Sequence, residues 1–171
     1  MKLIVVSDVH GRYSRLRELM DMHSDADGLI FLGDGLRDLD RADAYSYRFT
    51  VYAVRGNCDG LSLFGEDRDA PEELMLSLGG FRFFAIHGHT RGVKGGTEGA
   101  VAAAHARGAD VLLYGHTHLP EERYLPEGSQ LPYGETERRM WVFNPGSLGY
   151  DGSFGLIQIK DRQLLLSHGR L

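Results

Sequence analysis

The sequence predicts an α/β fold in which two β-sheets lie face to face and helices cover their outer sides. Strand-like and helix-like runs alternate over residues 2–54, which is typical of parallel strands joined by right-handed crossovers. Toward the end of the chain the strand-like runs follow one another directly, which is typical of antiparallel pairing. We expect a single domain over residues 1–171, because this length suffices for one well-packed core and is too short for two.

The first third of the chain is expected to form three strands and two helices. Residues 2–7, 28–32 and 49–54 are apolar runs that end at polar turns, as buried strands do. Leu16, Leu19 and Met20 recur at helical spacing among charged residues, so the first connection is predicted to be an amphipathic helix. A charged helical stretch over residues 38–44 is expected before the third strand.

The rest of the chain is expected to begin with a hairpin. Residues 73–78 and 81–86 flank a Gly-Gly pair, which is a two-residue signal for an antiparallel turn. A helix is predicted from Thr97, as its N-cap, to Arg107, where Gly108 ends it before a strand over 111–114. Later strands are expected, without intervening helices, near residues 122–125, 140–143, 154–159 and 163–167. Residues 126–137 are expected to form a variable hairpin loop, with a lid or an oligomer contact as alternatives.

Composition narrows the class of partner. A formal net charge of -5 disfavours extended nucleic acid as a ligand. The chain has one cysteine, Cys58, so an internal disulfide and a cysteine-based zinc cage are both excluded. The apolar run at residues 3–6 is far too short for a signal peptide, and we read no run long enough for a membrane span. We therefore expect a cytoplasmic protein without a membrane partner, and self-association stays open.

Polar side chains gather where the expected strands end, which is where α/β proteins assemble their sites. Donors two residues apart on an extended segment point to one face, so each such pair can grip one ion. Asp34 lies between two glycines, which lets its carboxylate bridge two ions. The oxygen and nitrogen donors are Asp8, His10, Asp34, Asn57, His87, His116 and His118. This set predicts two divalent cations and attack of a metal-bridging hydroxide on a phosphate ester.

Charge balance favours a phosphodiester as the substrate. Two divalent ions, neutralised in part by Asp8, Asp34 and a bridging hydroxide, leave about one positive charge. A phosphodiester carries one negative charge, so it matches the site that this reasoning predicts.

The polar segments together resemble a known family. In type and order they are similar to the pattern of the calcineurin-like metallophosphoesterase superfamily, and residues 144–147 resemble the turn that closes that pattern. In length, and in having Cys58, the chain is similar to the small bacterial and archaeal phosphodiesterase branch. The segments are Asp8-Val9-His10, Gly33-Asp34, Gly56-Asn57-Cys58-Asp59, His87-Gly88-His89, Gly115-His116-Thr117-His118 and Asn144-Pro145-Gly146-Ser147.

The resemblance implies a four-layer α/β/β/α fold with two mixed sheets, and it assigns the metal ligands. The first metal would be held by Asp8, His10, Asp34 and His118. The second would be held by Asp34, Asn57, His87 and His116. We expect manganese in both positions, with nickel, iron or zinc as alternatives.

The resemblance also identifies residues that would act on the substrate. Cys58 stands where larger members of the family have the histidine that protonates the leaving group. Asn57, Asp59 and His89 join it as candidate catalytic residues, although His89 could equally well only pack beside His87. Whether the basic side chains of Arg12, Arg55, Arg91 and Lys94 contact substrate stays open.

The sequence thus predicts a metal-dependent phosphodiesterase that acts on small organic or nucleotide phosphodiesters. A phosphomonoesterase is one alternative. Another is a non-catalytic, metal-binding scaffold of the type found in the retromer coat, which shares the fold implied by the resemblance. The presence of every expected ligand favours the enzyme.

Overall fold

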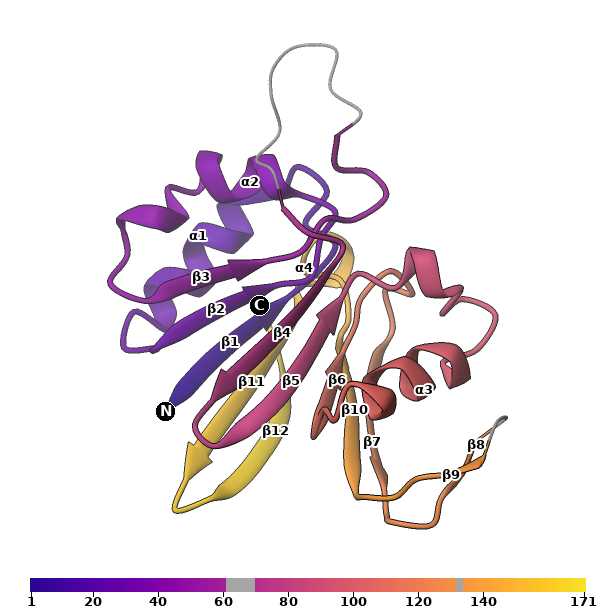
Figure 1. Ribbon diagram of the computed structural model, residues 1–171. Coiled ribbons are helices and arrows are strands. Elements are labelled where there is room, and N and C mark those ends of the chain that lie inside the picture. The colour runs from indigo at the N-terminus through magenta and orange to yellow at the C-terminus, as the bar shows by residue number, and fades with distance from the viewer. Residues whose placement is uncertain (61–69, 132–133) are drawn as a thin grey trace.

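The chain folds into two five-stranded β-sheets that face each other, with helices on both outer sides (Figure 1). The computed structural model describes residues 1–60, 70–131 and 134–171. The first sheet has the order β12-β11-β1-β2-β3, with β1 (Lys2–Val6), β2 (Gly28–Phe31), β3 (Thr50–Ala53), β11 (Ser153–Lys160) and β12 (Gln163–Arg170). The second has the order β4-β5-β6-β10-β7, with β4 (Glu73–Leu78), β5 (Phe81–Ile86), β6 (Val111–Leu113), β7 (Pro120–Leu125) and β10 (Met140–Pro145).

Both sheets are mixed. In the first, β1, β2 and β3 pair in parallel, and β11 and β12 add antiparallel strands beside β1. In the second, β5, β6 and β10 are parallel, whereas β4 and β7 are antiparallel edges. The helices are α1 (Tyr13–Met22), α2 (Leu36–Arg41), α3 (Glu98–Ala106) and α4 (Leu148–Asp151), with short 3-10 turns η1 (Ala44–Ser46) and η2 (His89–Arg91).

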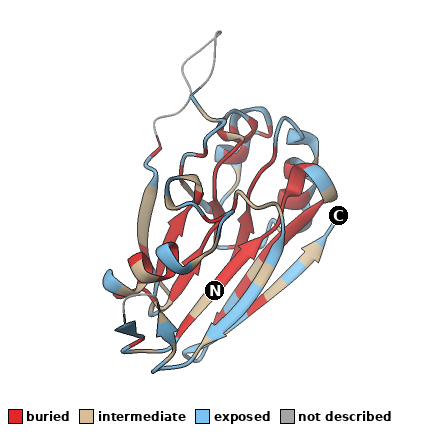
Figure 2. Cartoon of the chain, turned by 90° about the vertical axis from the view of Figure 1, so that its right-hand side faces the viewer, coloured by how far each residue is buried: buried red, intermediate tan, exposed pale blue. Residues whose placement is uncertain are grey.

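Strand β1 shows how the layers are built, because successive side chains of a strand point to opposite faces. Ile4 and Val6 pack with Leu16 of α1 in a core under the helices, whereas Leu3 and Val5 pack in the core between the sheets. These four strand residues are at most 1% exposed. Figure 2 shows the strands of the sandwich interior as mostly buried. Burying a side chain of this size contributes about 1.5–3 kcal/mol, so β1 anchors two layers at once.

The fourth layer is α3, which covers the outer face of the second sheet. Ala100, Val101 and Ala104 pack there with Phe84 and Leu112 in a third apolar cluster. The predicted sandwich of two mixed sheets with flanking helices is therefore confirmed. No helix in the described ranges is long and apolar enough to cross a membrane.

The structure refines several local expectations. The helix expected over 38–44 begins earlier, at Leu36, and is followed by the separate turn η1. The region 126–137, expected as a hairpin loop, contains the antiparallel two-stranded ribbon β8 (Gln130–Leu131) and β9 (Gly134–Glu135). Thr97 precedes α3, but its backbone is helical and its Oγ1 accepts a hydrogen bond from Arg123 Nη2 at 2.6 Å, so its side chain does not cap the helix.

Helix α4 is an element that the sequence analysis missed. The strands at the end of the chain were expected to follow one another without helices, yet α4 lies between β10 and β11. Four residues are too few to show a helical apolar period. The signal is instead Ser147, whose Oγ accepts a hydrogen bond from Tyr150 N at 3.1 Å, and Gly152, which ends the turn with a left-handed φ of 79°.

Candidate metal centre

The predicted ligands meet at the carboxyl ends of parallel strands from both sheets. In the first sheet, Val6 pairs with Phe31 and Phe31 with Ala53, so the segments after β1, β2 and β3 start at the same level. In the second, Ala85 pairs with Leu113, which aligns the segments after β5 and β6. The side chains form two clusters, Asp8 with His10 and His118, and Asp34 with His87 and His116, and in each cluster the ligand atoms lie within 4.8 Å of one another.

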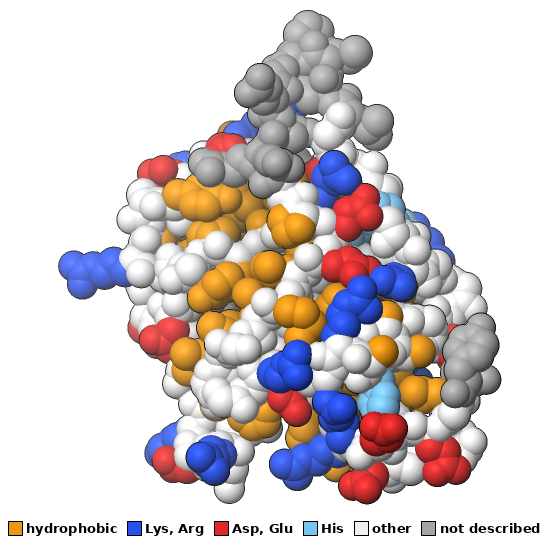
Figure 3. Space-filling view, viewed as in Figure 1, with side chains coloured by type: hydrophobic (Ala, Val, Ile, Leu, Met, Phe, Trp, Pro, Cys, Tyr) orange, Lys and Arg blue, Asp and Glu red, His pale blue; other side chains and the backbone are white. Residues whose placement is uncertain are grey.

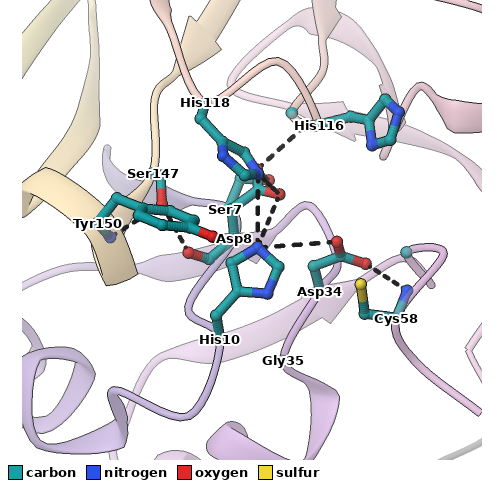
Figure 4. A network of polar contacts seen from close by, with 12 residues as sticks. Ser7, Asp8, His10, Asp34, Gly35, Cys58, His116, His118, Ser147 and Tyr150 are labelled. Atoms are coloured by element: carbon teal, nitrogen blue, oxygen red, sulfur yellow. Dashed lines mark hydrogen bonds and ion pairs between the residues drawn. The ribbon is translucent and has the colours of Figure 1, made fainter. Parts of the chain in front are cut away.

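The first cluster is centred on the Asp8 carboxylate (Figure 4). Asp8 Oδ1 lies 3.1 Å from His118 Nε2 and 3.6 Å from His10 Nε2, and the two imidazole nitrogens are 3.4 Å apart. The other oxygen, Oδ2, accepts hydrogen bonds from Ser7 Oγ at 2.6 Å and from His116 N at 3.0 Å. One carboxylate oxygen is thus held by the protein while the other faces two histidines.

Asp34 lies between the two clusters. Its Oδ2 is 3.9 Å from His10 Nε2 and 3.5 Å from His87 Nε2, and its Oδ1 accepts a hydrogen bond from Cys58 N at 2.8 Å. Figure 4 shows its carboxylate between His10 and Cys58. In the second cluster, His87 Nε2 lies 3.2 Å from His116 Nδ1. Asp34 therefore has the position that a bridging ligand requires.

His87 is oriented by a backbone carbonyl. It is fully buried, and its Nδ1 lies 2.7 Å from Leu32 O, so Nδ1 donates and leaves Nε2 facing the centre. Nε2 is 3.1 Å from Asn57 Oδ1, which brings the predicted amide ligand into the second cluster. The structure thus brings together all seven side chains that the sequence predicts as ligands.

The residues of the second cluster shift one another's pKa values. Burial opposes ionisation of Asp34, yet its contacts with His87 and with the amide of Cys58 hold the pKa of its carboxyl well below the usual range. Burial by itself would lower the pKa of His87, but the adjacent Asp34 raises it. Burial and the charges of His87 and Lys94 lower the pKa of His116 to about 4, so its imidazole is neutral and can act as a ligand at neutral pH.

The donor set fits two divalent cations. Asp8 Oδ1 is a buried carboxylate oxygen that accepts no hydrogen bond in the described part of the chain, and His118 Nε2 approaches it at ion-pair distance without hydrogen-bond geometry. Leaving such an atom unsatisfied costs about 1–3 kcal/mol or more. Carboxylate, imidazole and amide donors without an obligatory thiolate suit ions of borderline hardness. A cation among Asp8, His10 and His118 would satisfy the orphaned oxygen.

Backbone strain is concentrated at the same place. Within the described ranges, eight residues other than glycine have positive φ, a conformation that side chains disfavour. Five of them are predicted ligands, with φ between 47° and 68°, namely Asp8, His10, Asp34, His116 and His118. Strain of this kind persists where the surrounding structure over-determines the geometry, and it is typical of functional sites.

The turn at residues 144–147 holds the ligand segments in place. Asn144 Nδ2 donates to Gly115 O at 3.2 Å and to Thr117 Oγ1 at 3.0 Å, which fixes the segment carrying the last two histidines. Ser147 Oγ donates to Asp8 O at 2.8 Å. A Cβ at Gly115 would lie 1.9 Å from Ser7 Oγ, so only glycine permits this close packing. The turn thus joins loops that are far apart in sequence.

The carboxylate of Asp59, a predicted catalytic residue, accepts hydrogen bonds from four backbone amides. Its Oδ1 accepts from Gly35 N at 2.8 Å and Leu36 N at 2.9 Å, and its Oδ2 accepts from Asp34 N and Gly56 N, both at 2.8 Å. These contacts give Asp59 a positioning role, because they fix the backbone on both sides of the bridging ligand.

Cys58 faces the centre as a protonated thiol. Burial, together with the hydrogen bond and charge of Asp34, raises the pKa of Cys58 to about 11. The Cys58 Sγ lies within 4.8 Å of ligand atoms of His10 and Asp34, and Asn57 Nδ2 donates to it at 3.3 Å. A thiol with this pKa is a poor nucleophile at neutral pH.

Among the remaining candidate substrate contacts, one histidine has an unpaired ring nitrogen and two arginines form ion pairs with glutamates. His89 is placed with its ring 5.4 Å from that of His87, and its buried Nδ1 has no hydrogen-bond partner among the described residues. Arg55 pairs with Glu72 at 2.9 Å, and Arg91 pairs with Glu73. On the face in Figure 3, basic side chains lie among acidic ones.

The sequence analysis missed Tyr150 as a neighbour of the centre. Its ring is stacked on that of His118, with centroids 4.8 Å apart and planes inclined by 29°. Tyr150 belongs to α4, which the sequence analysis did not predict. The sequence carried one signal for this placement, since Tyr150 follows Ser147 of the closing turn by three residues.

Comparison with known proteins agrees with this geometry. Residues 1–162 match the family model of the calcineurin-like phosphoesterase superfamily domain. The chain is 30% identical over 182 residues to phosphodiesterase YfcE from Escherichia coli (strain K12), and the match covers 92% of this chain and 87% of that relative.

Two solved structures show the same fold. A protein from Streptococcus pneumoniae TIGR4, described as a predicted phosphoesterase, superposes with a TM-score of 0.74 at 23% identity and covers 99% of this chain and 88% of its own. Vps29 from Entamoeba histolytica, crystallised with zinc, superposes with a TM-score of 0.65 at 20% identity over 100% of this chain and 98% of its own.

Proposed function

Because the chain belongs to the calcineurin-like phosphoesterase superfamily, we propose that it is a dinuclear-metal phosphodiesterase that hydrolyses small organic or nucleotide phosphodiesters. The observation that carries the proposal is the position of Asp34, whose carboxylate lies between two clusters of donors. A second support is the phosphodiesterase from Escherichia coli, which is 30% identical over most of its length.

We propose a role for each cluster. Asp8, His10 and His118 would hold one cation, Asn57, His87 and His116 would hold the other, and Asp34 would contact both. Two such cations, when bound, lower the pKa of a shared water and withdraw charge from the phosphoryl oxygens. We propose manganese for both positions, with nickel, iron or zinc as alternatives that the same nitrogen and oxygen donors accept.

The protein's own residues orient the donors and control protons. The hydrogen bond between His87 and Leu32 O sets the tautomer that turns Nε2 toward the centre. Burial and the adjacent Asp34 raise the pKa of Cys58, which favours the thiol over the thiolate, and we propose that Cys58 acts as a weak acid beside the leaving group and not as a nucleophile. A weak acid favours substrates whose leaving groups need little protonation.

The proposal favours diesters over monoesters on charge. Asp8 and Asp34 are the carboxylates of the two clusters, so two divalent ions together with these carboxylates and a shared hydroxide would keep about one positive charge. A diester with one negative charge suits that balance. The chain's net charge of -5 makes a small phosphoester a better partner than extended nucleic acid.

The Vps29 structure shows that this fold also occurs outside proteins titled as phosphoesterases, which bears on the scaffold alternative. A metal-binding scaffold would need the same donors, so the support for catalysis is the relative titled as a phosphodiesterase, which is 30% identical, whereas Vps29 is 20% identical. A measurement of turnover separates the two functions directly.

The test compares bis(p-nitrophenyl) phosphate with p-nitrophenyl phosphate, each with manganese, nickel, zinc and magnesium. We expect hydrolysis that requires added metal and a higher kcat/KM for the diester. The control variant is Asp25→Ala, which removes an exposed carboxylate paired with Lys2 and leaves the centre untouched. Turnover of neither ester with any metal would overturn the proposal, and a preference for the monoester would assign a phosphomonoesterase instead.

A further inference from the structure

An apolar rim borders the otherwise polar centre. Leu119 and Tyr150 are the two most exposed large apolar side chains in the described residues, at 69% and 68%, and both adjoin His118. Leu119 follows His118 in the chain, and the Tyr150 ring is stacked on the His118 ring. Tyr150 also meets His10 edge-on, with centroids 5.5 Å apart (Figure 4).

Tyr150 is mounted on a fixed support. The amide of Leu148 donates to Ser7 O at 3.1 Å, and that of Gly149 donates to Asp8 O at 3.0 Å. These bonds tie α4 to the segment that carries the first ligands. The Tyr150 ring therefore stays beside the centre.

Two further contacts exclude movement of α4 away from this segment. Arg15 Nη1 donates to Leu148 O at 3.1 Å and to Gly149 O at 2.9 Å, which ties α1 to α4. A Cβ at Gly149 would lie 2.3 Å from Val9 O, so the two backbones touch. A mostly exposed tyrosine on an anchored backbone presents an aromatic surface beside the centre.

The Leu119 side of the rim opens into a groove. This groove has a volume of about 820 Å³, and Leu119 lines it with Val93, Lys94, Thr117 and Pro120. Pockets of about 300–1,000 Å³ accommodate small organic ligands. Thr117, which also lines the groove, lies between the predicted ligands His116 and His118 in the chain, so the groove is next to the segment that carries them.

We propose that the rim formed by Tyr150 and Leu119 binds the organic substituent of the substrate, and that Tyr150 selects an aromatic ring over a short alkyl group. The proposal rests on the proposed function, because the cation-binding residues would hold only the phosphoryl group. An aryl or nucleobase ring on that group would reach the exposed side of Tyr150, whose other side is covered by His118. Stacking of this kind requires a flat aromatic ring on the ligand, and it discriminates little between one aromatic ring and another.

The first test measures binding without any reaction. Phenylphosphonate and methylphosphonate present the same oxygens and differ in the substituent. The ratio of their dissociation constants on manganese-loaded protein therefore measures how much the rim contributes to binding of the phenyl group. We expect phenylphosphonate to bind more tightly, Tyr150→Ala to reduce the ratio about 3- to 10-fold, and Tyr150→Phe to keep it within about 2-fold. The matched control is Tyr124→Ala, since Tyr124 is 49% exposed on β7 and packs against Trp141.

A second variant separates substrate binding from support of His118. Tyr150→Leu keeps an apolar cover over His118 without an aromatic surface, and the metal content of each variant is measured in parallel. We expect Tyr150→Leu to bind both metals and to lose phenyl selectivity as Tyr150→Ala does. An unchanged ratio in Tyr150→Leu with both metals bound, or equal binding of the two phosphonates by the wild type, would overturn the proposal.

Kinetics distinguish failure of this proposal from failure of the proposed function. Phenyl p-nitrophenyl phosphate and methyl p-nitrophenyl phosphate share a leaving group, so the ratio of their kcat/KM values should fall in Tyr150→Ala as the binding ratio does. Selective phosphonate binding without turnover of either diester would support the rim and refute the phosphodiesterase. Turnover of both diesters with ratios that Tyr150→Ala leaves unchanged would support the phosphodiesterase and refute the rim.

Discussion

Replacement of Asp59 by alanine should destabilise the fold even when no metal is bound. The Asp59 carboxylate accepts four backbone hydrogen bonds, two on each oxygen. A hydrogen bond to a charged group contributes about 1.5–3 kcal/mol when buried. Asp59 is half-buried, and water replaces part of what is lost, so about 1 kcal/mol for each bond is appropriate. We therefore expect Asp59→Ala to lower the free energy of unfolding by about 3–4 kcal/mol.

Asparagine is a sharper probe of the same arrangement. The amide oxygen of Asp59→Asn could accept from one pair of amides, either Gly35 and Leu36 or Asp34 and Gly56. Its NH2 group would then face the other pair as a donor facing donors. We expect this variant to lose at least half as much stability as Asp59→Ala.

Urea denaturation in the presence of EDTA measures both effects without a contribution from metal. Asp25→Ala is the control, because Asp25 is exposed and water screens its ion pair with Lys2, so its removal should leave the free energy of unfolding nearly unchanged. A loss below about 1 kcal/mol in Asp59→Ala would refute the assignment of Asp59 as the residue that fixes the bridging segment.

Three further predictions follow from single residues. Asp34→Ala should abolish both metal occupancy and turnover, measured by elemental analysis beside an esterase assay, and full occupancy would contradict its bridging position. Cys58→Ser should keep at least about a tenth of the wild-type kcat, a barrier increase of no more than roughly 1.4 kcal/mol, and a trapped phosphocysteine would disprove this. Burial and the hydrogen bond to Asp21 raise the pKa of Tyr47 to about 12, above the ordinary value of 10.0, so its stabilising contribution is complete below pH 10 and is lost as the pH rises through 12. The stability difference between the wild type and Tyr47→Phe, from urea titrations, should shrink over that range, and a constant difference would count against the raised pKa.

The ligand positions could be predicted because each follows a buried strand within a few residues. Strand ends are readable from apolar runs, and parallel strands align their carboxyl ends, so local patterns were enough to bring Asp8, Asp34 and Asn57 together. The hairpin around Gly79 was predictable for a similar reason, since turn chemistry is local.

The supporting contacts could not be predicted, because they join residues that are far apart in the sequence. Ser147 Oγ reaches Asp8 O across 139 positions, and Arg15 reaches α4 across more than 130. No local pattern specifies such partners. Asp59 was assigned a catalytic role from its motif, whereas its bonds to backbone amides depend on how the loops after β2 and β3 pack.

The link between Ser147 and Asp8 has a consequence for the order of events during synthesis. Strand β1 is made first, but one of its two neighbours in the sheet is β11, and the clamp on Asp8 comes from the turn just before α4. A nascent chain whose residues up to about 140 have left the ribosome already carries every predicted ligand, yet it lacks the segment that fixes the first of them. Contacts of such long sequence separation form late in folding. Metal capture should therefore await release of the last part of the chain, which keeps reactive ions away from a half-built site.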